Sequence, residues 1–212
     1  MNTRRALMAG LSAAAAALGG LAGRRVMAEP EHAHPGAART TAWPHVTLYT
    51  HEGQAVTFYD DLIRGKVVAI NMMYTACEGI CPLATNNLVR VQELLGTRVG
   101  RALFMYSLTL QPERDTPPRL KEYAALHGVK AGWWFLTGTR DDIEQLRYRL
   151  GFFDLNPVVD GDTATHTGMI RIGSDGYDRW TSVSALATPA QIVATINHVD
   201  RSVGRMAGRP KG

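Results

Sequence analysis

The stretch from Val67 to Val91, VVAINMMYTACEGICPLATNNLVRV, constrains the fold of this chain more than any other segment. Its first seven residues are almost all apolar, which is typical of a strand that is buried on both faces. After Pro82 the apolar residues recur at the spacing of a helix. The two cysteines of the 212-residue chain, Cys77 and Cys81, stand between these two patterns. The stretch therefore predicts a buried strand, a loop with two sulfurs and a helix.

The position of Cys81 favours a reactive sulfur. Proline is favoured at the first helical position, so Pro82 predicts that Cys81 is the N-cap residue, close to backbone N–H groups and the positive end of the helix dipole. Such surroundings favour a thiolate, which can attack disulfides or bind soft metals such as Cu(I). A plain stabilising disulfide between Cys77 and Cys81 is the third interpretation. Only three residues separate the two cysteines, so this bridge would remove little entropy from the unfolded chain.

The first 28 residues have the pattern of a twin-arginine-type signal peptide. Arg4 and Arg5 precede an Ala/Leu-rich run, and small residues ending at Ala28 predict a cleavage site. Export would place the protein in the bacterial periplasm, where thiol pairs oxidise unless they are kept reduced or bind metal. An uncleaved, membrane-anchoring signal is the alternative, because an apolar run of about 17 residues is near the lower limit for a span.

The charge of the chain gives no indication of a nucleic-acid partner. The whole sequence has 23 Lys and Arg against 19 Asp and Glu, but residues 1–28 contain four arginines and no acid. From Glu29 onward the chain therefore has 19 basic and 19 acidic residues. The basic excess belongs to the export signal, and the remaining chain lacks the positive charge that nucleic acids require.

Residues 29–43, EPEHAHPGAARTTAW, are expected to be a mobile leader, because they are rich in Pro, Ala and polar residues without an apolar period. The leader contains His32 and His34, a pair that could hold a copper or zinc ion weakly and deliver it to a deeper site, although leaders often carry histidines without such a role. The folded domain is predicted to cover residues 44–206, and residues 207–212 are expected to be a disordered tail.

Strands alternate with helices along the predicted domain. In chain order the expected elements are a hairpin (46–49 and 55–58), a strand (67–73), the helix after Pro82, a strand (102–110), a helix (116–128), a strand (133–137), a helix that begins at Thr139, a loop (152–162), a hairpin (166–172 and 177–183) and a last helix (188–203). This order predicts an α/β protein with a central mixed sheet flanked by helices and an N-terminal β-hairpin extension. Its closing β-β-α unit resembles the second half of a thioredoxin fold.

His166 is the candidate partner of the two cysteines. Cys77 and Cys81 follow the carboxyl end of a central strand, where open α/β sheets carry their sites. In a thioredoxin-like sheet, the loop before the strand that His166 opens passes beside the cysteine loop. Thioredoxin-type redox motifs have two residues between their cysteines, whereas this chain has three, and a wider loop can hold two thiolates around a metal. Two thiolates and one imidazole suit Cu(I), or Cu(II) with an added ligand.

Three segments of the chain resemble the Sco/SenC family, which comprises thioredoxin-fold copper chaperones involved in assembling the binuclear copper centre of cytochrome c oxidase. The segments are YTACEGICP, SLTLQPERDTPPRLKEYA and HTGMIRIGSDG, and the resemblance covers residues 45–203. It implies that copper is the bound metal and that Cys77, Cys81 and His166 are its ligands. It also implies that the partner is the copper-centre subunit of a membrane oxidase or a related cuproenzyme.

The chain departs from the family pattern at three positions near these ligands. Glu78 stands where the family often has proline, Gln111 replaces a usual aspartate, and Thr165 replaces the acidic residue often found before the histidine. None of these changes removes a ligand, but each would alter hydrogen bonds around the metal. Three methionines also lie near the site in the sequence, where they could fill the core or supply a thioether ligand: Met72, Met73 and Met169.

A periplasmic copper metallochaperone is the leading hypothesis, and two others remain open. A thiol-disulfide oxidoreductase that reduces the cysteines of a copper site would use a Cys77–Cys81 redox disulfide and would need no histidine. A periplasmic thiol reductase could in turn keep this pair reduced. A thiol peroxidase would need an activating Arg and Thr or Ser around one cysteine, and the cysteine motif offers only Thr75.

Overall fold

The computed structural model describes residues 43–162, 165 and 168–200. The predicted signal peptide, the leader histidines His32 and His34 and the predicted tail lie outside the described residues, and so does His166. The predicted domain boundaries therefore stay predictions. Within the described part, no helix combines the length and the apolar character that crossing a membrane requires.

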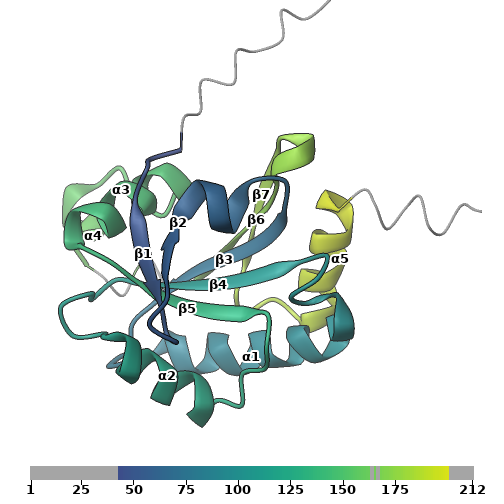
Figure 1. Cartoon of the computed structure of the whole chain (residues 1–212), viewed down its shortest axis with the longest axis horizontal. Coiled ribbons are helices and arrows are strands. Elements are labelled where there is room, and N and C mark those ends of the chain that lie inside the picture. Colours follow the sequence, from purple (N-terminus) through teal and green to yellow (C-terminus); the bar gives the residue numbers. More distant parts are fainter. Residues whose placement is uncertain (1–42, 163–164, 166–167, 201–212) are drawn as a thin grey trace, which may run out of the picture. The chain divides into compact units, whose positions relative to one another are not determined.

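A mixed seven-stranded sheet forms the centre of the fold, as predicted (Figure 1). Its strands are β1 (Thr47–Thr50), β2 (Ala55–Thr57), β3 (Val67–Met73), β4 (Phe104–Thr109), β5 (Trp133–Thr137), β6 (Met169–Ser174) and β7 (Arg179–Ser184). The spatial order is β2-β1-β5-β4-β3-β6-β7. Strands β3, β4 and β5 are parallel, whereas β6 runs antiparallel to β3. The predicted N-terminal hairpin is β1–β2, and it joins the sheet because β1 pairs with β5.

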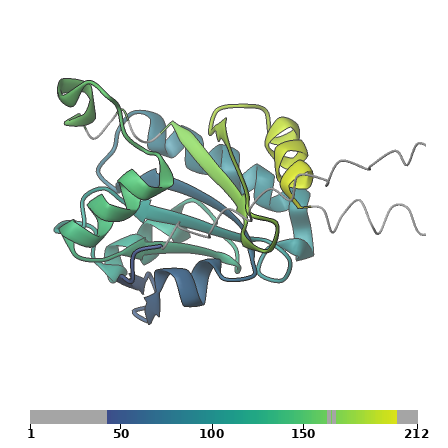
Figure 2. The same ribbon diagram turned by 90° about the horizontal axis from the view of Figure 1, so that it is seen from above.

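Helices cover both faces of this sheet. The helices are α1 (Ile80–Leu95), α2 (Pro117–Leu126), α3 (Arg140–Leu150), α4 (Pro157–Asp160) and α5 (Pro189–Val199), with a π-helical turn at Phe58–Ile63. Buried residues of α1, α2 and α5 share one core cluster, and those of α3 and the π-helical turn share the other. Figure 1 shows α1 and α2 below the strands and α3 above them, and Figure 2 shows α1 beside α5.

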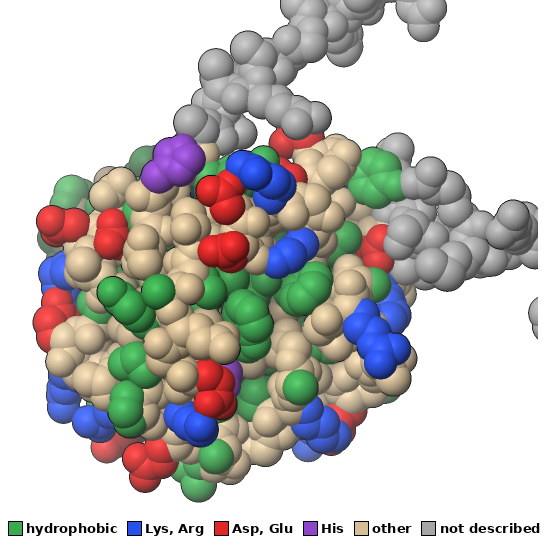
Figure 3. Space-filling view, in the orientation of Figure 1, with side chains coloured by type: hydrophobic (Ala, Val, Ile, Leu, Met, Phe, Trp, Pro, Cys, Tyr) green, Lys and Arg blue, Asp and Glu red, His purple; other side chains and the backbone are tan. Residues whose placement is uncertain are grey.

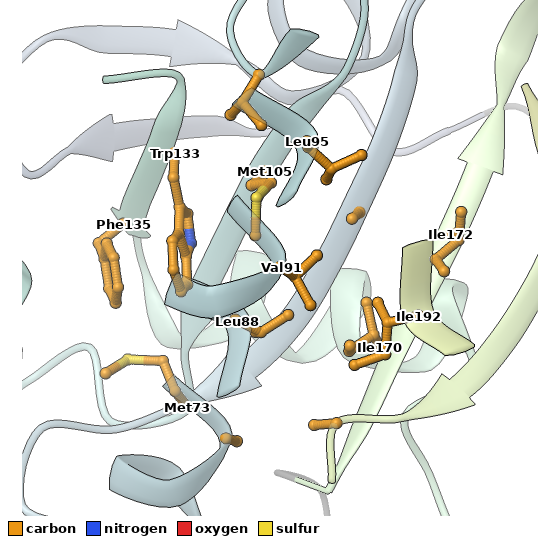
Figure 4. Close-up of a cluster of buried hydrophobic side chains, with 14 of the residues drawn as sticks. Met73, Leu88, Val91, Leu95, Met105, Trp133, Phe135, Ile170, Ile172 and Ile192 are labelled. Atoms are coloured by element: carbon orange, nitrogen blue, oxygen red, sulfur yellow. The ribbon is translucent and has the colours of Figure 1, made fainter. Parts of the chain in front are cut away.

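Strand β3 supplies side chains to both core clusters. Ala69 and Met73 belong to the cluster under α1, and Ile70 and Met72 belong to the cluster under α3. Each of the four side chains is at most 4% exposed, which explains why the strand is apolar along its length. Figure 4 shows Met73 in the first cluster, with side chains from α1 and β5. Met72 and Met73 therefore fill the core.

The predicted helix starts at Thr139 and Thr188 are confirmed. The Thr139 hydroxyl accepts a hydrogen bond from the Asp142 N–H at the start of α3, and Thr188 forms a full capping box with Gln191 at the start of α5. The predicted loop over residues 152–162 is wrong in part, because it contains α4. Asn156 caps this short helix and Pro157 occupies its first position, two residue types that are typical of turns as well as of helix starts.

The predicted start of α1 is also wrong. The helix begins at Ile80 with Gly79 as its N-cap residue, so Cys81 lies inside the first turn instead of capping it. Pro82 is the third helical residue, where the backbone N–H has no partner within the helix, so proline costs the helix no hydrogen bond there. A proline in the first turn therefore did not fix the first residue of α1.

A buried chain of hydrogen bonds joins the three parallel strands. The Trp133 Nε1–H donates to Ser107 Oγ at 2.9 Å, and the Ser107 hydroxyl donates to Asn71 Oδ1 at 2.7 Å. Ser107 is 1% exposed and Asn71 is 3% exposed, so water cannot replace a lost partner at either group. Ser107 therefore satisfies two polar groups in the core.

We expect Ser107→Ala to lower the free energy of unfolding by about 1–3 kcal/mol, because it leaves the Trp133 and Asn71 groups buried without their partner. Urea denaturation followed by circular dichroism measures this loss. Ser182→Ala is the matched control, since Ser182 is exposed on β7, and should change stability by less than about 0.5 kcal/mol. Equal losses in the two variants would contradict the role assigned to Ser107.

Candidate metal centre

The two cysteines lie at the carboxyl end of β3, as predicted. Residues 74–79 link β3 to α1, and the Cys77 N–H closes a turn by donating to the Tyr74 carbonyl at 3.3 Å. Cys77 is 7% exposed and Cys81 is 1% exposed, and both are present as thiols. The fold therefore places two buried sulfurs where the loop after β3 meets α1, and a Cys77–Cys81 disulfide stays a prediction.

Hydrogen-bond donors surround the sulfur of Cys77. Burial alone would raise the pKa of this thiol, but hydrogen bonds from the Cys81 side chain, from the backbone N–H groups of Cys81 and Gly79 and from the Tyr74 hydroxyl outweigh burial, so the pKa of Cys77 lies below its usual range. The sequence pattern predicted the favoured thiolate at Cys81. The backbone N–H groups of Gly79 and Cys81, at the start of α1, donate to Cys77, and the favoured thiolate at Cys81 stays a prediction.

Two tyrosines lie beside the sulfurs. Burial, with smaller contributions from the nearby Cys77 and Cys81, raises the pKa of Tyr74 to about 12. Burial also raises the pKa of Tyr123 to about 12, with smaller contributions from the same cysteines, and its hydroxyl lies 3.1 Å from Thr85 Oγ1. Both tyrosines therefore keep their protons, and Tyr74 can donate a hydrogen bond to a thiolate at Cys77. Neither tyrosine was predicted from the sequence to belong to the site.

A buried aspartate accepts hydrogen bonds from the cysteine loop. Asp115 is 0% exposed, and its carboxylate accepts hydrogen bonds from the backbone N–H and the hydroxyl of Thr75, at 3.1 and 2.5 Å. The Thr109 hydroxyl at the end of β4 donates to the same carboxylate at 2.5 Å. Asp115 belongs to the segment that resembles the Sco/SenC family, but periodicity cannot predict burial of a loop aspartate.

The described residues on each side of His166 follow the predicted path. The Thr165 hydroxyl donates to the carbonyls of Val159 and Asp162, at 3.0 and 2.8 Å. A Cβ atom placed on Gly168 would lie 3.3 Å from Cδ1 of Ile80, a residue of the CEGIC motif, so the backbone of this loop touches the first turn of α1. The assignment of His166 as a ligand stays a prediction.

Other predicted neighbours lie at the edge of this site. Glu78 is exposed next to Cys77, and Thr165 is exposed before His166. Met169 opens β6 and is 41% exposed, in contrast to the buried Met72 and Met73. Within residues 43–162, 165 and 168–200, no group of three His, Cys, Asp or Glu side chains could hold a metal ion. Cys77 and Cys81 thus offer two sulfur donors, which suit a soft metal, and a third donor must come from another residue type or from outside these ranges.

The surface agrees with the balanced charge of the domain. On the face shown in Figure 3, basic and acidic side chains are interspersed with apolar ones. This face carries no broad patch of one sign that would attract a polyanion.

Comparisons with known proteins identify the family of the chain. Residues 36–200 match the SCO1/SenC family model. A Stutzerimonas stutzeri protein named for copper binding is 29% identical over 141 residues, which cover 65% of this chain and 67% of that protein. The SCO1 homologue of Bacillus subtilis is 30% identical over 101 residues, covering 47% of this chain and only 51% of the relative.

A solved structure, copper-bound ScoI of Bradyrhizobium japonicum, has the same fold. The TM-score is 0.57 at 23% identity, and the match covers 73% of this chain and 96% of the ScoI chain. This likeness, together with the strand order, confirms the predicted thioredoxin-like fold. Because the family model matches most of the sequence, the chain belongs to the SCO1/SenC family.

Proposed function

We propose that this protein is a periplasmic copper metallochaperone. The observation that carries the proposal is the pair of buried thiols at the start of α1, with hydrogen-bond donors around Cys77. Thiolates are soft ligands that select Cu(I), and the names of a relative and of a structural neighbour mention copper. Membership of the SCO1/SenC family supports the same function.

In this proposal Cys77, Cys81 and His166 are the copper ligands. Gly168, two residues after His166, lies beside Ile80 in the first turn of α1, which supports an approach of the imidazole to the sulfurs. Bound copper would be released by ligand exchange, in which donors of the acceptor replace these ligands one at a time. The acceptor would approach over Ala76 and Glu78, which are exposed, because the remaining sides of the cysteine loop are packed against the core.

The proposed acceptor is the copper-centre subunit of a membrane oxidase or of a related cuproenzyme. A solved structure with the same fold, BsSco, is described as a member of the Sco family of cytochrome c oxidase assembly proteins, which supports an oxidase link. The export signal predicted for residues 1–28 supports it too. An oxidising periplasm would convert the two thiols to a disulfide, so a periplasmic thiol reductase is the second proposed partner.

A thiol-disulfide oxidoreductase is the second candidate function. The donors around the Cys77 sulfur favour it, because they would stabilise the thiolate that attacks a disulfide. This function needs two cysteines and no histidine. The effect of removing His166 therefore distinguishes it from copper delivery.

We expect the reduced protein to bind one copper ion per chain, and Cys77→Ser and Cys81→Ser to abolish tight binding. His166→Ala should weaken Cu(II) binding by at least about 100-fold, because even the loss of a supporting hydrogen bond to a ligand costs 10–100-fold. Competition titrations of Cu(I) and Cu(II) against chelators of known affinity measure these constants.

His198→Ala is the matched control for this titration. His198 is exposed on α5, and its Nε2 lies 2.9 Å from the Arg179 guanidinium. Arg179 is at the opposite end of the β6–β7 pair from Met169, so removing His198 should leave copper affinity unchanged. Equal affinity of the wild type and His166→Ala would contradict the proposed ligand set. Failure of the reduced wild type to bind copper would contradict the proposed function.

We expect His166→Ala to lose copper transfer to a copper-centre subunit while it still reduces a dithiol-specific disulfide probe at the wild-type rate. The reason is that disulfide exchange uses only Cys77 and Cys81. Both activities are measured on the same preparation. If His166→Ala instead supported oxidase assembly as well as the wild type did, the oxidoreductase function would replace the proposed one.

We expect export to depend on the first arginine pair. Replacing Arg4 and Arg5 by lysine should retain the full-length protein in the cytoplasm, whereas the wild type should be found in the periplasm with Glu29 as its first residue. Cell fractionation and mass spectrometry of the purified protein measure both properties. Replacing Arg24 and Arg25 by lysine is the control and should leave export intact. A wild type that keeps residues 1–28 in the membrane would show that the signal is an anchor.

A further inference from the structure

The cysteine loop is connected to the body of the fold through one buried carboxylate. Asp115 is 0% exposed and lies in the loop between β4 and α2. Three hydrogen bonds reach its two oxygens: two come from Thr75, two residues before Cys77, and one comes from Thr109 at the end of β4. The carboxylate therefore joins the cysteine loop to the neighbouring parallel strand.

A further donor, Arg119, determines that the Thr75 hydroxyl is the donor in its hydrogen bond with Asp115. The Arg119 Nε–H, in the first turn of α2, donates to Thr75 Oγ1 at 3.0 Å. The Thr75 hydroxyl therefore accepts from Arg119 and donates its own proton to Asp115. All three of these hydrogen bonds are thus donated to Asp115, an arrangement that suits an ionised carboxylate.

A buried charge of this kind is costly for a purely structural link. Removing a carboxylate from water costs several kcal/mol, and well-packed apolar residues often connect two segments as well or better. The advantage of the carboxylate is directional, since it fixes both the backbone N–H and the hydroxyl of Thr75. This fixes the start of the Tyr74–Cys77 turn, in which the Cys77 N–H donates to the Tyr74 carbonyl.

We propose that Asp115 is a positioning residue that holds Cys77 next to Cys81 through Thr75. The inference rests on the proposed function, because it assigns Asp115 to the same two sulfurs. Tyr123 is consistent with this placement, because Cys81, Cys77 and Asp115 each raise the pKa of its hydroxyl. In this proposal Asp115 acts on the sulfurs through the two hydrogen bonds that it accepts from Thr75.

Positioning should affect disulfide formation without any metal. Two Cys thiols and one glutathione disulfide give the Cys77–Cys81 disulfide and two glutathione thiols, so two electrons pass from the cysteines to glutathione disulfide and the protons are conserved. The Cys77 and Cys81 side chains already share a hydrogen bond, so the fixed loop gives each sulfur a high effective concentration near the other. Loss of the hydrogen bonds between Thr75 and Asp115 should lower this effective concentration of one sulfur near the other.

The test compares Thr75→Val, Asp115→Asn and Ser107→Ala. Thr75→Val removes the hydroxyl that donates to Asp115 from the cysteine loop. Ser107→Ala removes a buried hydroxyl of β4 whose partners are Asn71 and Trp133, so it is the control for a general loss of stability. We measure the equilibrium with a glutathione redox buffer without copper, the free energy of unfolding in urea, and the Cu(II) absorption spectrum.

We expect Thr75→Val and Asp115→Asn to shift the glutathione equilibrium severalfold toward the dithiol and to alter the Cu(II) spectrum, with copper affinity about tenfold lower. Ser107→Ala should lose stability and leave the equilibrium within twofold of the wild type. If Asp115→Asn fails to fold, Thr75→Val decides the question by itself.

Two results would overturn the inference. One is a glutathione equilibrium that is the same in Thr75→Val as in the wild type, because Asp115 would then stabilise the fold without positioning Cys77. The absence of a disulfide in both proteins counts as this result. The other is an equal shift in Ser107→Ala, because general stability would then explain the effect. Failure of the wild type to bind copper would contradict the proposed function but would leave this copper-free comparison valid.

Discussion

The burial of β3 on both faces is the constraint on which the rest of the structure depends. The strand is hydrogen-bonded to β4 on one side and to β6 on the other, and its side chains enter both core clusters. Such a strand cannot shift by one residue without turning every side chain to the opposite cluster. The end of β3 at Met73 therefore fixes where the cysteine loop begins.

Polar groups inside the fold then determine how the segments after β3 are arranged. Ser107 connects Asn71 to Trp133 across the middle of the parallel strands, and Asp115 connects Thr75 to Thr109 at their carboxyl ends. Buried polar groups are costly unless all partners are present, so each connection favours one arrangement of the strands and loops around it. The site thus depends on hydrogen bonds made between elements that are distant in the sequence.

This dependence explains how far the sequence could predict the molecule. β3, β5 and the caps at Thr139 and Thr188 follow from local patterns, and they agree with the structure. The alternation of strands and helices predicted the fold class, and the pattern around Pro82 drew attention to the two cysteines, to which the family resemblance then assigned a role. Local patterns could not predict the pairing of β1 with β5, the donors at Cys77 or the burial of Asp115, because each results from contacts between segments that are far apart in the sequence.

The departures of this chain from the family pattern differ in their consequences for the site. Glu78 is exposed, so water and salt screen its charge from the sulfurs. Gln111 is partly buried, and its backbone N–H donates to Thr109 Oγ1 at 2.9 Å. The same Thr109 hydroxyl donates to Asp115. This contact uses the backbone of residue 111, so an aspartate at this position could make it as well. The substitution at Gln111 therefore leaves the hydrogen bond to Thr109 in place, whereas the substitution at Glu78 adds an exposed carboxylate next to Cys77.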